Sequence, residues 1–515
     1  MNILQVFRQL ALLLLVLATV LLLTAAFSAL RLLLGHNIET YAAESLAIAG
    51  AIGAVVGGAL WAVTRHATGV IGRREALLLV ALSWLIGAGL AAAPFRLWAA
   101  LSPRAGADHP FAESVNCYFE SMSGLTTTGA TILSNIEGLP ESILLWRALT
   151  HWFGGLGIVV LFVAVLPSLG VGGKKLYRVE APGPSPEGLS PQIRDTARAL
   201  WYIYLGMTVA QIIALCLAGM TWFDSACHTF ATMATGGFST RNASVGAYNS
   251  PVIDTILIVF MFLAGMNFGL FYQGFKGRLS LIWRDTELRF YCVLVGGGSA
   301  IVAYSLLGQP ITMTTGEQIP PSAVDAIRQG VFTTVSVQTT TGFCTSDFNL
   351  WPDVAKCVLV GLMFVGGCAG STGGGIKVIR IWIMLKILVA EIERAFRPKV
   401  MRPVKVGDSA IDDDQKLSTL VFVMAAVLIF AVGSVSILLL ENGHSDCDCD
   451  YVTASTASVA TLCTIGPGLN RVGAIENYGW FTAASKSVMC LLMVIGRLEI
   501  FAIAVLFTPR FWRGD

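Results

Sequence analysis

The chain has 515 residues and a mass of 54.9 kDa, with a formal net charge of +2. Only 13% of the residues are Asp, Glu, Lys or Arg, about half the usual quarter, whereas 55% are apolar and the mean hydropathy is +0.71. So few charges cannot cover a soluble globule of this size, and the near-zero charge offers no strong field for nucleic acid. The composition therefore indicates a membrane protein, and its unusual feature is 53 glycines.

Ten apolar segments are long enough to cross a bilayer as helices, which takes about 20 residues. They are predicted at 10–34, 43–64, 76–98, 143–169, 199–220, 252–275, 290–308, 354–385, 418–441 and 484–508. The first could be read as a signal peptide, since Arg8 precedes its apolar run. It is too long for one, however, and no small-residue cleavage site follows it. We expect all ten to span the membrane.

Basic residues predict the orientation, because Lys and Arg concentrate in cytoplasmic loops. With the N-terminus inside, the largest inner loop, around 377–416, holds nine lysines and arginines. The opposite orientation would place the basic loops outside. Both termini are therefore predicted to be cytoplasmic.

Four short segments on the outer side form an internal repeat. They lie near 113–135, 224–245, 322–347 and 450–470, and are too polar to span yet too apolar and threonine-rich for exposed loops. Each has a short helix-compatible stretch followed by threonine and a glycine, namely Gly129, Gly236, Gly342 and Gly466. These glycines lie 107, 106 and 124 residues apart, and such near-constant spacing indicates repeated units.

The predicted fold is an all-α polytopic membrane protein with two N-terminal helices and four helix–pore loop–helix repeats around one central pore. It has ten spanning helices and four re-entrant pore loops. The predicted units are two N-terminal transmembrane helices at 1–75, pore repeat 1 at 76–198, pore repeat 2 at 199–289, pore repeat 3 at 290–416 with an intramembrane gating loop at 366–377, and pore repeat 4 at 417–515.

Re-entrant loops point to ion conduction. Non-helical backbone at membrane depth is tolerated only where it is buried in protein or faces water. Four such loops around one axis would line a pore with carbonyls, whose dipoles can replace the hydration shell of a monovalent cation. A single Thr-Thr-Gly would more often be an ordinary turn, but four at matched positions favour a pore.

The densest glycine cluster lies inside the predicted span 354–385. Six of the ten residues 366–375 are glycine, and each costs about 1 kcal/mol in a helix interior. The helix must therefore break, as a hinge, a packing kink or a functional loop. A phosphate-binding loop would need a lysine directly after Gly375, where Ile376 stands. Lys377 fits equally well as part of this loop or as a positive-inside anchor.

Arg497 is a charge in the middle of a predicted span. Such a residue is costly in a bilayer and is a functional candidate by default. Glu499 lies two positions away and does not share its helix face, so a purely structural ion pair is the weaker alternative. The spans otherwise hold almost no acidic residues, and neither the histidines nor the cysteines show metal-ligand or catalytic spacing. No enzyme activity is expected.

These motifs resemble the Trk/Ktr/HKT superfamily of potassium transporters, and within it the bacterial Trk-system uptake proteins of the TrkH/TrkG type. The resemblance covers nearly the whole chain and rests on seven stretches: Gly124–Thr131, His151–Gly157, Leu166–Pro184, Ala234–Thr240, Thr339–Phe343, Gly370–Lys377 and Ile465–Leu469. It implies potassium uptake across the bacterial inner membrane, through four non-identical repeats folded around one pore.

The resemblance also implies site residues. The selectivity filter for K+ would comprise Thr127, Thr128, Gly129, Ala234, Thr235, Gly236, Thr340, Thr341, Gly342, Thr464, Ile465 and Gly466. Gly129 favours potassium, because serine at this position accompanies sodium transport in HKT relatives. The gate would comprise Gly366, Gly367, Gly370, Ser371, Thr372, Gly373, Gly374, Gly375 and Lys377 with Arg497 as an ion barrier.

The implied partners are a second copy of the chain in a homodimer, a cytosolic nucleotide-binding Trk regulatory subunit (NAD, ATP or ADP), and membrane lipid. No nucleic acid and no organic cofactor are expected, and K+ is the transported ion. The alternative is a coupled secondary transporter (Na+ or H+ symport) for another cation or a small solute. Such transporters use paired repeats and midplane sites, which four repeats and carboxylate-poor spans do not suggest.

Overall fold

The computed structural model describes residues 1–69, 71–106, 108–155, 157, 193–398, 404–407, 409–443 and 449–513. The inner part of the predicted span 143–169 and the stretch Leu166–Pro184 lie outside these ranges. Within them the chain is mainly helical, as the composition and the long apolar segments predict.

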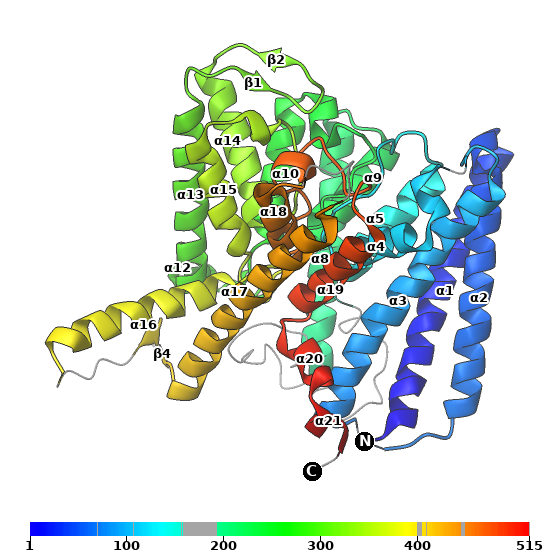
Figure 1. Ribbon diagram of the computed structural model, residues 1–515, viewed down its shortest axis with the longest axis horizontal. Helices are drawn as coiled ribbons and strands as arrows, with labels where there is room; N and C mark the ends of the chain where they lie inside the picture. The colour runs from blue at the N-terminus through cyan, green and yellow to red at the C-terminus, as the bar shows by residue number, and fades with distance from the viewer. Residues whose placement is uncertain are drawn as a thin grey trace.

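Three long helices begin the chain: α1 (Ile3–Leu33), α2 (Thr40–Thr64) and α3 (Arg73–Leu101), with a 3-10 turn η1 (Asn37–Glu39) between the first two. Helices α1 and α2 run side by side (Figure 1). A Cβ added at Gly50 or Gly53 of α2 would crowd Leu22 or Leu90, and one at Gly57 would press on Leu15. Small residues let helices approach closely in a bilayer, so part of the glycine excess serves helix packing.

The same order of helices recurs four times in the remaining part of the chain that the structure describes. The short central helices are α4 (Ser114–Leu125), α9 (Trp222–Met233), α14 (Ala323–Gln338) and α18 (Tyr451–Leu462). The helices before them are α3, α8 (Ile193–Leu217), α13 (Thr286–Leu306) and α17 (Asp413–Glu441). The helices after them are α5 (Glu141–Gly155), α10 (Pro251–Ala264), α15 (Asp353–Phe364) and α19 (Ala483–Arg497). We call the four central helices the pore helices.

Three predicted spans are not straight helices. Helix α10 is followed by α11 (Phe268–Phe275) at an angle of 94°, and α19 is followed by the segment Phe501–Phe507 (α20, Phe501–Ala504, then η6, Val505–Phe507) at 113°. Helix α15 ends at Phe364, and α16 (Val378–Phe396) begins only after the glycine-rich loop. The spans predicted at 252–275, 354–385 and 484–508 therefore break near their middle.

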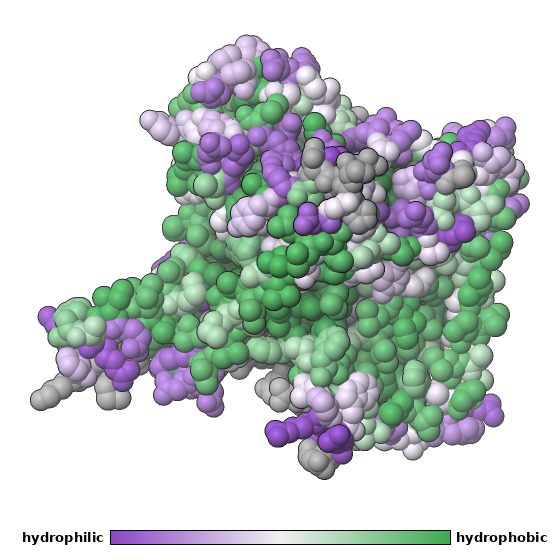
Figure 2. Space-filling view, viewed as in Figure 1, coloured by the Kyte–Doolittle hydropathy of each residue, from purple (hydrophilic) through white to green (hydrophobic). Residues whose placement is uncertain are grey.

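Six helices in the described ranges are long and apolar enough to cross a membrane, or eight if each bent pair counts as one span. Figure 2 shows a broad apolar band across the face in view, with polar residues gathered above and below it. Both termini lie at the end opposite the β1–β2 hairpin (Figure 1). The chain is a multi-pass membrane protein, and the count of ten spans stays a prediction.

The remaining elements are short and lie in connections. They are η2 (Pro110–Ala112), η3 (Ser244–Tyr248), α12 (Leu279–Arg284), η4 (Phe348–Leu350), η5 (Asn470–Val472) and α21 (Pro509–Arg513). Two antiparallel hairpins correct the all-α prediction locally: β1 (Ile311–Thr312) with β2 (Gln318–Ile319), and β3 (Lys405–Val406) with β4 (Ser409–Ala410). In the first, Ile311 lies opposite Ile319. Neither hairpin contributes to the site described next.

Candidate functional site

The four pore helices end in the same unusual turn. Two residues after each helix, at Thr127, Thr235, Thr340 and Thr464, the backbone φ is 55°, 55°, 59° and 55°. A positive φ at a β-branched residue is a genuine outlier and costs free energy. The same strain at four matched positions indicates that the turn geometry itself has a function.

The hydrogen bonds of the turns also match. The amide N–H after each strained threonine donates to a carbonyl five residues earlier, at 2.8 or 2.9 Å: Thr128 to Ser123, Gly236 to Ala231, Thr341 to Ser336 and Ile465 to Ala460. These bonds satisfy carbonyls that the helix ends would otherwise leave without a partner. The turns are therefore built alike, although their sequences differ.

This geometry corrects the predicted register of the second loop. The glycine two residues after the strained threonine has a positive φ in every loop: 81° at Gly129, 78° at Gly237, 78° at Gly342 and 95° at Gly466. The matching residue in the second loop is therefore Gly237, where Gly236 was predicted. Ala234, predicted to line the filter, is instead the C-cap of α9.

The four glycines form a closed ring. A Cβ added at Gly129 would overlap the carbonyl oxygen of Gly236, one at Gly237 that of Thr341, and one at Gly342 that of Ile465. A Cβ at Gly466 would crowd the carbonyl oxygen of Thr128, which returns the contacts to the first loop. Each glycine thus packs against the carbonyl that precedes the next glycine in the ring. Only glycine fits, for reasons of space as well as of φ.

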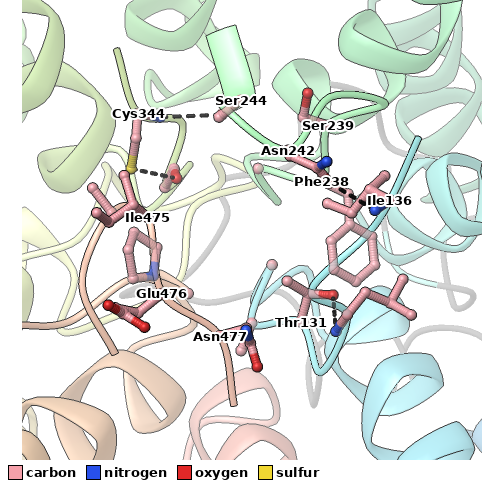
Figure 3. Close-up of a pocket in the computed structure, with 18 of the residues that line it drawn as sticks. Thr131, Ile136, Phe238, Ser239, Asn242, Ser244, Cys344, Ile475, Glu476 and Asn477 are labelled. Carbon is pink, nitrogen blue, oxygen red and sulfur yellow. Dashed lines mark hydrogen bonds between the residues drawn. The ribbon is translucent and has the colours of Figure 1, made fainter. Parts of the chain in front are cut away.

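An open cavity of about 130 Å³ lies against this ring. All four ring glycines line it, together with polar side chains from the segments that follow them, including Thr131, Ser239 and Asn477. Figure 3 shows these segments converging on the cavity from different parts of the chain. Charged residues are few, so the chemistry that the cavity presents is mainly that of backbone and neutral polar groups.

The glycine-rich loop is closed at its base. Val365 and Ile376 pair as a short parallel bridge, the Gly366 N–H donates to the Ile376 carbonyl at 3.0 Å, and the Ile376 N–H donates to the Phe364 carbonyl at 3.0 Å. The residues between them form a compact loop that lies against the ends of the pore helices.

The loop contacts three of the four turns. The Thr372 hydroxyl donates to the carbonyl of Met233 at 3.0 Å, at the end of α9. The Gly374 N–H donates to the Thr340 hydroxyl at 2.7 Å, and a Cβ at Gly374 would overlap the Thr464 hydroxyl. These contacts involve the turn residues that precede the ring glycines, whereas the cavity is lined by the glycines and the residues after them.

Arg497 extends this arrangement to the first repeat. It is the last residue of α19, and its guanidinium donates to the Thr372 carbonyl at 2.8 Å, to the Gly155 carbonyl at 3.0 Å and to the Gly154 carbonyl. Glu499 does not lie on the same helix and pairs with Arg380 at 2.6 Å. The guanidinium thus joins the loop to the end of α5.

Lys377 is buried inside the loop. Its ammonium group donates to the Gly373 carbonyl, and the residue is only 4% exposed. A positive-inside anchor would reach the membrane surface, so that interpretation of Lys377 is wrong.

A family model described as a TrkH cation transport protein matches residues 43–513. The chain belongs to the TrkH family. It is 39% identical over 460 residues to the Trk system potassium uptake protein TrkH of Escherichia coli strain K12, covering 89% of this chain and 90% of that protein. It is 40% identical over 469 residues to the TrkH protein of Halomonas elongata, covering 90% of this chain and 91% of that one.

A solved structure supports the same TrkH relationship. The crystal structure of the potassium transporter TrkH from Vibrio parahaemolyticus matches with a TM-score of 0.78 at 34% sequence identity. The match covers 98% of this chain and 100% of that chain. The resemblance that the motifs indicate is therefore confirmed at the level of the family.

Sequence reasoning missed three buried charged residues of this TrkH-family chain. Glu120 and Arg147 form a 2.7 Å ion pair beside the cavity, and Glu287 accepts backbone N–H groups from the glycine-rich loop and from α16. A signal was present for Arg147, since an arginine within an apolar run marks a functional candidate. Among the described residues, no group of three or more His, Cys, Asp or Glu could hold a metal ion.

Proposed function

We propose that this protein takes up potassium across the bacterial inner membrane through a pore whose filter is the ring of four turns. The observation that carries the proposal is the closed ring, in which each ring glycine packs against a backbone carbonyl of the next loop. The names of its relatives, which are potassium uptake proteins, support K+ as the transported ion. The chain is a transporter, with K+ as its cargo.

The proposed filter consists of backbone carbonyls in the corrected register. It comprises Thr127, Thr128, Gly129, Thr235, Gly236, Gly237, Thr340, Thr341, Gly342, Thr464, Ile465 and Gly466. Inward carbonyl dipoles would replace water around a dehydrated cation, and the number and field of the carbonyls would set the preference for potassium. The C-terminal ends of the pore helices adjoin the turns and add a partial negative charge that favours a cation.

The proposed gate is the loop 366–377 together with Arg497. The loop fits against the second, third and fourth turns, and Arg497 joins it to the first repeat at the end of α5. The two together would close the path next to the filter. The guanidinium carries a positive charge, which would repel an approaching cation. Opening would require the bonds from Thr372 to the end of α9 and from Gly374 to the Thr340 turn to break.

The assembly that we propose follows from the family. It comprises ten spanning helices arranged as two N-terminal helices and four repeats, cytoplasmic termini, a homodimer, and a cytosolic nucleotide-binding Trk regulatory subunit. Both termini lie at one end of the molecule, which supports the predicted orientation (Figure 1). The glycine-rich loop leads directly into α16, so a partner that moved α16 would move the gate.

A coupled secondary transporter for another cation or solute is less well supported. Such proteins bind cargo at the interface of paired repeats, through half-helix ends and intramembrane side chains. Here four matched turns meet in a ring of backbone groups, and the relatives are named for potassium.

Reconstitution tests the proposal. Purified protein in lipid vesicles, loaded with potassium, should accumulate external rubidium, and external potassium should block that accumulation more strongly than sodium. Vesicles that take up neither rubidium nor potassium, with or without a Trk regulatory subunit and nucleotide, would contradict it.

A further inference from the structure

Arg147 lies behind two neighbouring filter loops. It is on α5, is 1% exposed, and its guanidinium uses each nitrogen in a bond to a different group. Its Nε donates to the Glu120 carboxylate at 2.7 Å, and its Nη2 donates to the Thr131 hydroxyl at 3.3 Å. Its Nη1 donates to the Ser239 carbonyl at 3.2 Å, in the second loop.

The same guanidinium also stacks on the second loop. Its central carbon lies 3.9 Å from the centre of the Phe238 ring, a cation–π contact. Figure 3 shows Thr131, Phe238 and Ser239 together at the edge of the cavity. Thr131 and Ser239 each follow a ring glycine by two residues, so Arg147 holds the two loops at matched positions immediately beyond the ring.

Glu120 completes the connection from inside α4. It is 0% exposed and accepts hydrogen bonds from the Thr131 hydroxyl at 2.9 Å and from the Ile132 N–H at 3.0 Å, besides Arg147. A buried ion pair adds little stability unless every remaining donor and acceptor is satisfied. This pair is well satisfied, and a polar network of that kind rigidifies what it joins.

The second loop is held to its own pore helix by a carboxylate, since Asp224 of α9 accepts from the Thr240 hydroxyl at 2.6 Å and pairs with Arg241 at 2.9 Å. The third and fourth loops have bonds between neutral groups. In the third repeat the Ser336 hydroxyl donates to the Phe343 carbonyl at 2.8 Å, and in the fourth the Thr456 hydroxyl accepts from the Leu469 N–H at 3.0 Å. Each of these bonds stays within one loop and its own pore helix. Other bonds also join neighbouring loops, such as that from the Cys344 N–H to the Ser244 hydroxyl at 3.3 Å. Arg147 differs from them because it joins two loops through a buried, charged and planar guanidinium whose geometry is fixed.

We infer that Arg147, positioned by Glu120, is a specificity-determining positioning residue, which fixes the separation of the first two filter loops. The inference rests on the proposed function. Sodium is smaller than potassium, so carbonyls that coordinate it must move inward. A rigid connection between two adjacent loops opposes that movement and leaves the ring suited to the larger ion.

The test compares ion selectivity in reconstituted vesicles. Arg147→Met keeps most of the length of the side chain but removes its charge. Glu120→Gln keeps the shape of the side chain but removes its charge. Arg147→Lys keeps the positive charge but lacks the planar guanidinium. The matched control is Arg328→Met. Arg328 forms a 2.7 Å bond to Asp254 between α14 and α10, is equally an Nε–carboxylate pair, and does not line the cavity.

We expect Arg147→Met and Glu120→Gln to raise the sodium-to-potassium permeability ratio about tenfold, the scale of one lost hydrogen bond to a charged group. Arg147→Lys should give a smaller rise, and Arg328→Met should leave the ratio at the wild-type value. A general loss of stability would lower the flux of both ions without changing their ratio.

The inference would be overturned if both Arg147→Met and Glu120→Gln conduct potassium with the wild-type sodium-to-potassium permeability ratio. That result would leave the proposed function intact. If Arg147→Met does not assemble, Glu120→Gln and Arg147→Lys decide the question by the same ratio. Wild-type protein that conducts no potassium would overturn the proposed function, and the inference with it.

Discussion

Threonine is an unexpected residue at a φ near +55°, yet it occupies that conformation in all four loops. The sequence motif predicts a turn and predicts that its glycines accept positive φ, and both features are present. It does not predict that the residue two places earlier is strained as well. That strain depends on the contact between loops, which local sequence does not encode.

The second loop shows a different limit of sequence reasoning. Two consecutive glycines, Gly236 and Gly237, fit the motif equally well, and spacing between repeats varies by more than one residue. The Gly-Phe pair offered a signal, because Gly237-Phe238 parallels Gly342-Phe343. Only the hydrogen bonds and the ring contacts decide between the two.

The corrected register predicts the effect of Gly237→Ala. The added Cβ would overlap the Thr341 carbonyl at a φ of 78°, so the ring should be distorted. We expect potassium flux in vesicles to fall at least about tenfold, since strain of this kind costs about 1–3 kcal/mol. Gly206→Ala on α8, where an added Cβ meets nothing within 4 Å, should leave flux unchanged. Wild-type flux in Gly237→Ala would refute the register.

Arg497→Ala tests the proposed barrier. The change removes a positive charge and its three bonds to the loop and to α5, so basal potassium flux without regulatory subunit should rise several-fold. Arg31→Ala is the control. Arg31 lies on α1 and pairs with Glu141, at the start of α5, and neither residue belongs to the glycine-rich loop. Basal flux in Arg497→Ala no higher than in the wild type and in Arg31→Ala would show that the guanidinium is structural.

At the scale of elements, glycine density predicts one helix break and misses two. The break in 366–375 follows from the cost of six glycines. The bend after α10 has weaker signals, Gly265 and the helix-capping Asn267, whose side chain accepts the Gly269 N–H. The bend after α19 has one weak signal, Gly496, but the residues that adopt positive φ there are Glu499 and Ile500. Packing in the folded protein must impose that bend.

Glu287 fixes the glycine-rich loop to helix α13. Its carboxylate, on α13, accepts the Ala369 N–H at 2.7 Å and the Ile379 N–H at 3.1 Å, and so fixes both the loop and the first turn of α16. Glu287→Ala leaves these donors without an acceptor. We expect basal potassium flux to rise a few-fold and the stimulation by regulatory subunit and nucleotide to shrink in proportion.

The control for Glu287 is a second buried carboxylate with a similar task. Glu441, 1% exposed, accepts the Thr482 N–H at 3.0 Å where α19 begins. Glu441→Ala should lower thermal stability to a similar extent without raising basal flux. Equal basal flux in the two variants would show that Glu287 contributes stability alone.

At the scale of the whole molecule, composition predicts the membrane class and the fourfold spacing predicts the repeat. Both predictions depend on properties averaged over many residues, and such averages can be read directly from the sequence. The ring, the loop beneath it and the Arg147–Glu120 pair depend on contacts between segments up to hundreds of residues apart. Family resemblance could place the filter and the gate approximately, but not the side chains that hold them.

The two N-terminal helices lie outside the ring and are joined to α5 of the first repeat by a buried carboxylate. Glu39 accepts the Ser28 hydroxyl of α1 at 2.8 Å, and the Ser142 N–H of α5 at 3.3 Å together with its hydroxyl. Glu39→Ala should destabilise the protein by about 1–3 kcal/mol, the cost of unsatisfied buried donors, and lower the midpoint of thermal unfolding in detergent. The sodium-to-potassium permeability ratio should not change. A changed ratio would contradict this expectation and show that the N-terminal helices affect selectivity.

The central claim, potassium uptake through the glycine ring, is tested most directly in a cell that lacks its own potassium uptake systems. The wild-type chain, expressed with a Trk regulatory subunit, should restore growth at low potassium and uptake of rubidium. Gly129→Ser should weaken this uptake and let sodium compete, since the side chain would meet the Gly236 carbonyl in the ring. Absence of uptake by the wild type under every partner and nucleotide condition would contradict the account.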